Sequence, residues 1–346
     1  MPNVVLITGA AGWLGGLLAH ALRDDPKTPD VQLILADIVE PKAPDGNKAV
    51  TIKADLTDKA QVEALFDTPL GIPDTVYCMH GIMSRGSEDD FELGLKVNID
   101  SVRLLLETTR QKTPPGQLIK FIFTSSLAVY GGPLPEVVTP STIATPEGAY
   151  GMGKLTSELL VNEYTRRGFI DGRILRLPTV VVRPGPPPPP PPPSSPVRGP
   201  FSPGCIRIIR EPLKGLETTC PIGDSLASPE LDSLAAWLAS PQTTVRNFVI
   251  AKHVPASAFY PHTRVVYLPG FTATVRDELD ALEKVAGKEV VQLVKFKDDP
   301  VNRRIVKSWP AKFDIEYPLS LGFVVDEGGM EPIVRQFKKD VEEGRA

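Results

Sequence analysis

The stretch Val4-Val5-Leu6-Ile7-Thr8-Gly9-Ala10-Ala11-Gly12-Trp13-Leu14-Gly15 lies near the start of the chain and decides its fold. Its first four residues form a β-rich apolar run, which is typical of a parallel strand buried on both faces. Beyond the glycines, apolar residues recur at helical spacing until Pro26, at Leu14, Leu17, Leu18, Ala21 and Leu22. A strand, a glycine-rich turn and a helix in this order predict an α/β fold built on a Rossmann-type, doubly wound parallel sheet.

The glycines of this turn each suit a dinucleotide. Gly9 permits the tight turn, Gly12 lets the backbone approach a pyrophosphate, and Gly15 lets the helix pack closely on the strand. The positive end of the helix also attracts phosphate charge. A glycine-rich turn without a cofactor is the alternative, but the flanking strand and helix favour nucleotide binding. We expect cofactor contacts at Gly9, Gly12, Trp13, Leu14 and Gly15.

Two acidic residues at strand ends indicate which dinucleotide is bound. Asp37 follows the predicted strand 32–36 and lies 22 residues after Gly15. A carboxylate there can accept hydrogen bonds from ribose hydroxyls and would repel a 2′-phosphate, so NAD is preferred over NADP. Asp55 and Leu56 end a third predicted strand and would lie near the adenine. Either aspartate could instead cap a turn or helix.

Tyr150 and Lys154 are the candidate catalytic pair. Four positions apart on a helix, their side chains share one face, and an ammonium beside a phenol favours the phenolate, a usable base. Lys154 could also hold a cofactor ribose. Ser126 follows the apolar strand predicted at 118–123, so its hydroxyl would face the same crevice and bind a substrate alcohol. Asn98, on an earlier helix, could hold a water that relays the proton, or could simply be exposed.

The residues that contact the substrate and the nicotinamide are predicted from the segments that follow parallel strands. The loop 80–90 contains Ser84 and Arg85, while Pro178 and Val180 lie near the end of a sixth strand and could contact the nicotinamide. Arg183 comes directly afterwards. It either binds a substrate carboxylate or satisfies strand-end carbonyls. His80 has no metal-ligand or triad partner nearby in the sequence, so a structural role is favoured.

Composition excludes several classes of function. The 346 residues are 42% hydrophobic, enough for a large core, and the net charge of -4 without a basic run argues against nucleic acid or an anionic membrane as partner. Three cysteines at irregular spacing indicate neither disulfides nor a metal site. No apolar stretch is long enough to span a bilayer. We expect a cytoplasmic enzyme with a small-molecule substrate.

The second half of the chain begins with a run of eight prolines, residues 186–193. This run must be polyproline II, either a rigid spacer or a segment that docks a protein partner. Leu231, Leu234, Ala235 and Leu238 predict a helix behind Ser228 and Pro229, and further helices are predicted at 275–285 and 333–341. We assign residues 1–183 to an NAD-binding domain. Residues 184–346 would form a smaller substrate lobe, interleaved with elements that return to the first domain.

The order and spacing of these motifs resemble the extended short-chain dehydrogenase/reductase superfamily, which includes NAD-dependent epimerases and dehydratases. The resemblance rests on the glycine turn, Asp37, Asn98, Ser126-x-x-x-Tyr130-Gly131 and Tyr150-x-x-x-Lys154. It implies a Rossmann-type domain, NAD, and a Ser, Tyr, Lys and Asn catalytic set. Four further segments are similar to the D-erythronate dehydrogenase group: 123–137, 176–185, 209–213 and 267–270.

The resemblance implies an NAD-dependent oxidoreductase that oxidises the C2 hydroxyl of a short, D-erythronate-like sugar acid to a ketone. The carboxylate of such a substrate needs a cation, for which Arg183 and Arg85 are the candidates. Two alternatives stay open: a nucleotide-sugar epimerase of the same superfamily, and a regulator that binds NAD without turnover. Dehydration is less favoured, because Thr124-Ser125-Ser126 contains no acidic residue. A homodimer is left open as the assembly.

Overall fold

A computed structural model of the chain describes residues 3–46, 48–185 and 204–346. Its main feature is a seven-stranded sheet in the order β10-β6-β5-β4-β1-β2-β3, in which every neighbouring pair is parallel. The strands are β1 (Val4–Thr8), β2 (Gln32–Asp37), β3 (Ala49–Lys53), β4 (Thr75–Cys78), β5 (Lys120–Ser126), β6 (Asp171–Leu177) and β10 (Val265–Tyr267). The doubly wound parallel sheet predicted from the sequence is confirmed.

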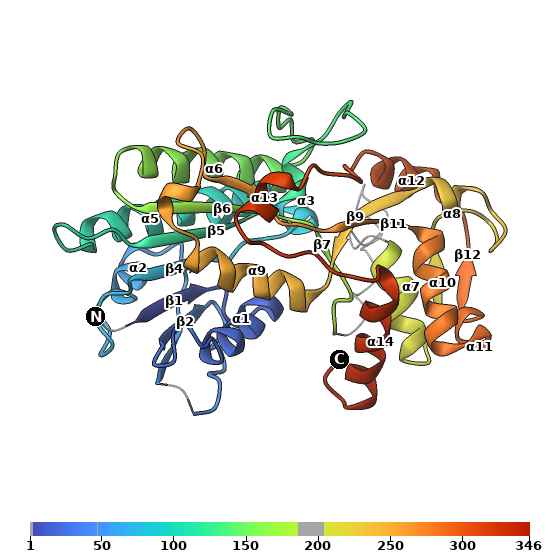
Figure 1. Ribbon diagram of the computed structural model, residues 1–346, viewed down its shortest axis with the longest axis horizontal. Helices are drawn as coiled ribbons and strands as arrows, with labels where there is room; N and C mark the ends of the chain where they lie inside the picture. Colours follow the sequence, from blue (N-terminus) through green and yellow to red (C-terminus); the bar gives the residue numbers. More distant parts are fainter. Residues whose placement is uncertain (1–2, 47, 186–203) are drawn as a thin grey trace.

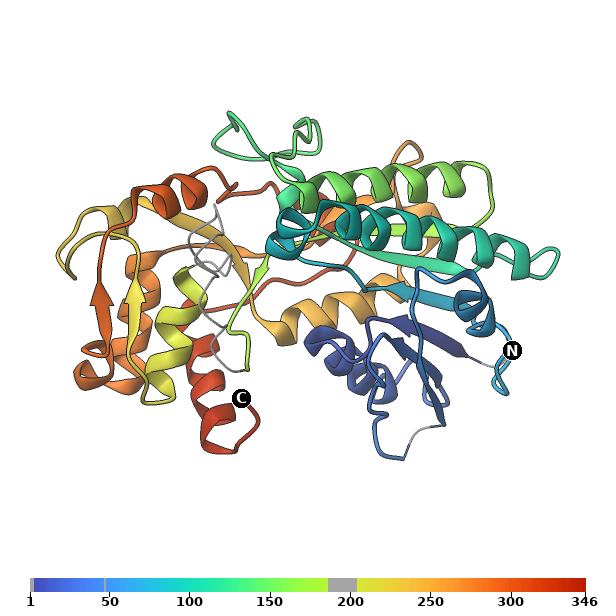
Figure 2. The same ribbon diagram turned by 180° about the vertical axis from the view of Figure 1, so that it is seen from behind.

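Helices cover both faces of this sheet (Figures 1 and 2). One face packs against α1 (Trp13–Arg23) and α9 (Pro241–His253), in a core that includes Leu18, Leu22 and Phe248. The other face is covered by α2 (Lys59–Ala64), α5 (Ser101–Lys112) and α6 (Ala149–Arg166). Both α9 and β10 come from the second half of the chain, so that half contributes to the large sheet as well as to the lobe.

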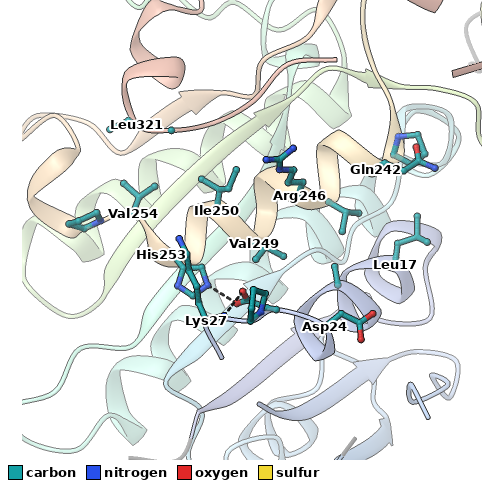
Figure 3. A pocket seen from close by; sticks show the side chains of 17 residues that line it. Leu17, Asp24, Lys27, Gln242, Arg246, Val249, Ile250, His253, Val254 and Leu321 are labelled. Carbon is teal, nitrogen blue, oxygen red and sulfur yellow. Dashed lines mark hydrogen bonds and ion pairs between the residues drawn. The ribbon is translucent and has the colours of Figure 1, made fainter. Parts of the chain in front are cut away.

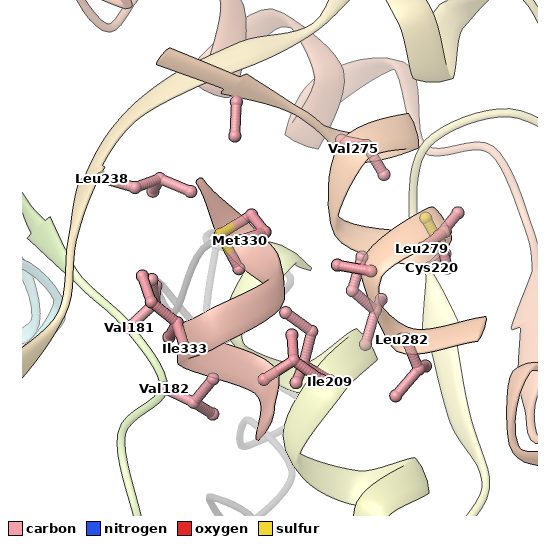
Figure 4. Packing of buried hydrophobic residues seen from close by; sticks show 14 of the residues in the cluster. Val181, Val182, Ile209, Cys220, Leu238, Val275, Leu279, Leu282, Met330 and Ile333 are labelled. Carbon is pink, nitrogen blue, oxygen red and sulfur yellow. The ribbon is translucent and has the colours of Figure 1, made fainter. Parts of the chain in front are cut away.

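The lobe beside the sheet has its own apolar core, part of which is drawn in Figure 4. Ile209, Leu282 and Val334 are among the side chains that are fully or almost fully buried there. Its elements are α7 (Gly204–Leu213), β8 (Thr218–Cys220), α8 (Glu230–Ser233), α10 (Val275–Ala286), α11 (Lys288–Val291), β12 (Val294–Phe296), α12 (Pro300–Lys307) and α14 (Met330–Glu342). A small sheet in the order β11-β9-β7 adjoins this core, formed by β7 (Thr179–Val180), β9 (Ala235–Ala239) and β11 (Phe271–Thr274).

The remaining elements are short, and several border the carboxyl ends of the large sheet's strands. They are α3 (Ser84–Asp89), α4 (Phe91–Leu95), the π-helical turn η1 (Lys96–Asp100), the 3-10 turns η2 (Leu127–Val129) and η3 (Ala256–Ala258), and α13 (Glu316–Ser320). Among the residues that the structure describes, no helix has the length and apolarity needed to cross a membrane.

One predicted helix is wrong. The apolar spacing from Leu231 to Leu238 predicts a single helix, but α8 ends at Ser233 and residues 235–239 form β9. This strand pairs with β11 on one side and with β7 on the other. Pairing partners about 35 and 60 positions away in the chain decide its conformation, and local periodicity does not report them. The helix capped by Thr274 is present, and Asp277 completes its capping box.

A buried ion pair joins α6 to the sheet. The guanidinium of Arg176 on β6 donates from Nε to Oε1 of Glu158, at 2.8 Å, and from Nη2 to Oε2, at 2.6 Å. Ser125 on β5 donates to the same carboxylate at 2.5 Å, and the Arg176 guanidinium also donates to the hydroxyl of Tyr130 at 2.5 Å. Glu158 and Arg176 are both more than 90% buried. One helix and two strands are therefore fixed relative to one another.

Removing the charge of Glu158 tests the strength of this anchor. We expect Glu158→Gln to lower the free energy of unfolding by about 3–5 kcal/mol, because Arg176 would remain buried without its carboxylate. Urea denaturation followed by circular dichroism measures the change. Glu163→Gln is the matched control on the same helix: its carboxylate pairs with Arg166 and Arg167 at the surface, so its midpoint should barely move. Equal midpoints for the two variants would contradict this prediction.

Candidate active site

The glycine turn between β1 and α1 has the geometry of a dinucleotide cradle. Gly9 has φ +74°, and a Cβ there would lie 2.7 Å from the backbone nitrogen of His80. A Cβ on Gly15 would lie 2.2 Å from the carbonyl oxygen of Gly9. Neither position can carry a side chain without moving the backbone. The first turn of α1 follows directly, and Gly12 is its N-cap. Because glycine has no side chain to accept from the N–H groups of this turn, those groups can bind a pyrophosphate. These residues fit NAD.

Asp37 lies beside this turn. Its Oδ2 accepts a hydrogen bond from the backbone of Ala11 at 3.0 Å, and its Oδ1 accepts one from Ile38 at 2.7 Å. The strand end and the cradle are thereby linked, in a position suited to an adenosine ribose. Asp55 is engaged locally, because its Oδ1 accepts from both the backbone and the hydroxyl of Thr57. The Leu56 side chain packs in the core.

Ser126 and Tyr150 come together because α6 packs unusually close to the end of β5. A Cβ on Gly151 would lie 2.0 Å from the carbonyl oxygen of Ala128, so only glycine allows this approach. Ser126 caps the turn η2, accepting from the backbone of Ala128 at 3.1 Å. Burial raises the pKa of the Tyr150 phenol, whereas the nearby hydroxyl of Ser126 acts to lower that pKa. The two hydroxyls predicted from the sequence are therefore neighbours.

Lys154 lies in the same site but makes different contacts from those we expected. Its ammonium donates to the carbonyl oxygen of Thr124 at 2.9 Å and lies 5.8 Å from the centroid of the Tyr150 ring. Burial lowers the pKa of Lys154 to about 8. Desolvation is the largest influence on the pKa of Tyr150 and raises it, so an electrostatic effect of Lys154 on the phenol stays a prediction.

Asn98 does not offer a free amide to a water molecule. It is buried in η1, where Oδ1 accepts from the backbone of Ile82 at 3.0 Å. Its Nδ2 donates to the carbonyl oxygen of Ile82 at 2.9 Å and to Ser87 at 3.0 Å. The side chain therefore fixes the loop that precedes α3. A Cβ on Gly153 would lie 2.9 Å from the Cβ of Asn98, so η1 also packs tightly on α6.

His80 has the structural role that the sequence favoured. Its Nδ1 lies 2.8 Å from the hydroxyl of Thr8, and its Nε2 lies 2.7 Å from the hydroxyl of Ser101. Burial lowers its pKa to about 3, so the imidazole is neutral at physiological pH. The histidine thus ties the end of β1 to the start of α5, directly behind the glycine turn.

The candidate substrate residues differ in exposure and in the contacts that their side chains already make. Arg85 forms an ion pair with Asp89 at 3.1 Å within α3, and Ser84 begins the same helix. Arg183 is exposed, and its guanidinium contacts the sulfur of Met83 at 3.6 Å. Pro178 is buried between β6 and β7, while Val180 pairs with Ala239 in the small sheet. The proline run lies outside the described residues.

A separate cavity of about 790 Å³ lies between α1, α9 and the chain near Leu321 (Figure 3). Its wall is largely apolar, with a 2.7 Å hydrogen bond between Nε2 of His253 and Oδ2 of Asp25. Ser126, Tyr150 and Lys154 do not line it. Within the described part of the chain, no group of three or more His, Cys, Asp and Glu side chains is arranged to hold a metal. The predicted catalytic residues therefore lie at the strand ends, away from this cavity.

Sequence reasoning missed the residues that bring the site together. Gly151 and Gly153 permit the close packing of α6, and Glu158 with Arg176 anchors it. The two glycines carried a readable signal, since glycine inside a helix costs about 1 kcal/mol relative to alanine and suggests a packing reason. Glu158 lies four positions after Lys154, but nothing local identifies Arg176 as its partner.

Comparisons with known proteins agree with this geometry. Residues 5–191 match the NAD dependent epimerase/dehydratase family. The D-erythronate dehydrogenase of Cupriavidus necator is 38% identical over 97% of this chain and 98% of its own length, and that of Haemophilus influenzae is 36% identical over 96% and 98%.

Among solved structures, a nucleoside-diphosphate-sugar epimerase from Agrobacterium tumefaciens has a TM-score of 0.86 at 31% identity, covering 100% of this chain and 96% of that one. The L-threonine 3-dehydrogenase of Trypanosoma brucei, at TM-score 0.78 and 23% identity over 99% and 98% of the two chains, shares the fold. The family resemblance seen in the motifs is confirmed, and the chain belongs to the NAD dependent epimerase/dehydratase family.

Proposed function

We propose that the protein is an NAD-dependent dehydrogenase that oxidises the C2 hydroxyl of a short sugar acid, D-erythronate in the first place, to the 2-keto acid. The observation that carries the proposal is the meeting of Ser126, Tyr150 and Lys154 at the carboxyl ends of strands that also form the glycine cradle. Full-length similarity to two D-erythronate dehydrogenases supports the substrate class.

The roles of the residues follow from their positions. Ser126 would hydrogen-bond the substrate hydroxyl and hold it against Tyr150, whose phenolate would take the hydroxyl proton as the C2 carbonyl forms. Lys154, fixed by the Thr124 carbonyl, would hold the cofactor ribose beside the phenol. Bound NAD supplies the acceptor for the hydride that leaves C2. Gly9, Gly12, Gly15 and Asp37 would hold the dinucleotide in its cradle.

Epimerisation is the alternative within the same family. The epimerase from Agrobacterium tumefaciens shares 31% of its residues with this chain, fewer than the two dehydrogenases share. An epimerase regenerates its bound cofactor, whereas a dehydrogenase releases it reduced. A regulator without turnover would have no need of Ser126, Tyr150 and Lys154 together. Dehydrogenation is therefore the function that the site supports best.

The two segments of the chain have different proposed roles. We infer that residues 1–183 bind NAD and carry the catalytic groups, and that residues 184–346 supply the substrate lobe together with α9 and β10. A homodimer and a cytoplasmic location remain predictions from the sequence. A docking role for the proline run is a prediction on residues that lie outside the described ones.

Release of reduced cofactor tests the proposed reaction. Purified protein with NAD and D-erythronate should produce free NADH, measured by absorbance at the nicotinamide band, and a 2-keto acid in equal amount. A UDP-sugar should give no net NADH. Interconversion of UDP-sugars without NADH release would overturn the dehydrogenase assignment in favour of the epimerase.

Tyr150→Phe tests the proton acceptor. We expect turnover to fall by about 10²- to 10⁴-fold, the range typical of general base catalysis, with NAD affinity almost unchanged. Tyr164→Phe is the matched control, because that hydroxyl lies on the same helix but donates to Glu107, far from Tyr150. Its turnover should stay close to wild type. Full activity of Tyr150→Phe would remove the phenol from the mechanism.

The pH dependence tests the protonation state of Tyr150. Burial raises the pKa of this phenol above its ordinary value, so the phenolate is the minor form at neutral pH. Oxidation needs that form, and kcat/KM for D-erythronate should therefore rise with pH between about 6 and 9, while the reverse reduction should slow. Initial rates at saturating NAD measure the profile. A profile that is flat over this range would indicate another base.

A further inference from the structure

If the substrate is a sugar acid, as the proposed function has it, its carboxylate needs a positively charged side chain that is free to pair with it. The choice of that side chain rests on the proposed function. Three of the basic side chains near the site are committed. Lys154 donates to the Thr124 carbonyl, Arg176 is buried against Glu158, and Arg85 is paired with Asp89 at 3.1 Å. Arg85 was one of the two candidates from the sequence, and a substrate carboxylate would have to compete there with Asp89.

Arg183 is different. It is exposed, and it forms no ion pair with any carboxylate in residues 3–46, 48–185 and 204–346. Its guanidinium lies 3.6 Å from the sulfur of Met83, so it reaches across to the loop that follows β4. That loop starts at the catalytic centre, because a Cβ on Gly81 would lie 3.3 Å from the Lys154 amine. The Arg183 guanidinium therefore contacts the same loop, residues 81–83, that passes beside the Lys154 amine.

The backbone that carries Arg183 is held by α7. Arg210 donates to the Arg183 carbonyl at 3.4 Å, and Lys214 donates to the Gly185 carbonyl at 3.3 Å. The Arg210 side chain is only 5% exposed, and Glu211 orients it through two hydrogen bonds at 2.7 and 3.0 Å. The side chains of Arg210 and Lys214 thus hold the backbone at residues 183–185. Because this backbone is already ordered, less conformational entropy is lost when the Arg183 guanidinium binds an anion.

The charge balance favours an anion at this place. Arg183, Arg207, Arg210 and Lys214 bring four positive charges, and Glu211, which accepts from Arg210 and lies 3.6 Å from Arg207, brings one negative charge. Within residues 3–46, 48–185 and 204–346, the buried Nε atom of Arg207 has no hydrogen-bond partner, and Oε1 of Glu211 lies 3.6 Å from it. A guanidinium also matches a carboxylate with two parallel hydrogen bonds.

We propose that Arg183 binds the substrate carboxylate and that Arg210 is the positioning residue that fixes it. The pairing makes the enzyme selective for 2-hydroxy acids over the corresponding neutral polyols. It would also direct oxidation to C2, since the carbon next to the bound carboxylate would be the one presented to Tyr150. In this proposal Arg85 pairs with Asp89 within α3 and does not bind the substrate.

The test compares two arginine variants in the NAD-loaded enzyme. Arg183→Gln should raise KM for D-erythronate by about 10- to 100-fold, the value of a charged hydrogen-bonded contact, with a smaller change in kcat and none in KM for NAD. Arg85→Gln is the matched control and should leave KM within about 2-fold. Arg183→Lys should recover part of the loss. The Arg183→Gln change should be absent with erythritol, the neutral polyol, as a slow substrate.

Arg210→Lys tests the positioning role, because lysine keeps the charge beside Glu211 but cannot hold both that carboxylate and the Arg183 carbonyl. KM for D-erythronate should rise several-fold, with kcat and the urea midpoint near wild type. Calorimetric titration of D-erythronate into the enzyme with NADH gives the same comparison without turnover. An unchanged KM and affinity in Arg183→Gln, with wild type active, would overturn this inference alone. A wild-type enzyme that oxidises no aldonic acid would overturn the proposed function instead.

Discussion

The ion pair between Glu158 and Arg176 is the constraint on which the catalytic arrangement depends. Tyr150, Lys154 and Glu158 follow one another at intervals of four on α6, so they occupy one face of the helix. The last of the three is bonded to Arg176 on β6 and to Ser125 on β5, next to Ser126. Fixing Glu158 therefore fixes the register of Tyr150 against Ser126. A helix held only by apolar contacts could slide or rotate by small amounts, and a bidentate pair does not allow this.

Close packing explains the electrostatics of the site. Gly151 and Gly153 let α6 approach η2 and η1, which removes water from around the phenol and the amine. Burial accordingly raises the pKa of Tyr150 and lowers that of Lys154 to about 8. Both shifts favour neutral groups, and they have one cause. The protein thus holds a neutral phenol beside an amine that loses its proton more easily than an exposed lysine does.

The sequence predicted the Rossmann half well because its signals are local. Buried parallel strands appear as apolar runs, glycines mark a backbone that must turn or approach closely, and polar residues at strand ends face the crevice. The strand β9 and the pair of Glu158 with Arg176 depend on partners far away in the chain, so no window of sequence reveals them. The hydrogen bonds of Asn98 could not be predicted for the same reason, because its partner Ile82 lies 16 positions earlier, in the loop that precedes α3. Local pattern thus locates catalytic groups but does not identify what holds them.

The two halves of the chain meet at the strand β7, and under the proposed function this junction separates the catalytic residues from the residue proposed to bind the substrate carboxylate. Thr179 and Val180 continue from β6 of the large sheet but pair with β9 of the small sheet. Val181 and Val182 then enter the core of the lobe, next to Ile209 of α7. The position of Arg183 is therefore set by the lobe, whereas Ser126, Tyr150 and Lys154 are set by the large sheet. Changes in the lobe can alter which substrate is accepted without moving the groups that transfer the proton, as expected for a fold that serves many reactions.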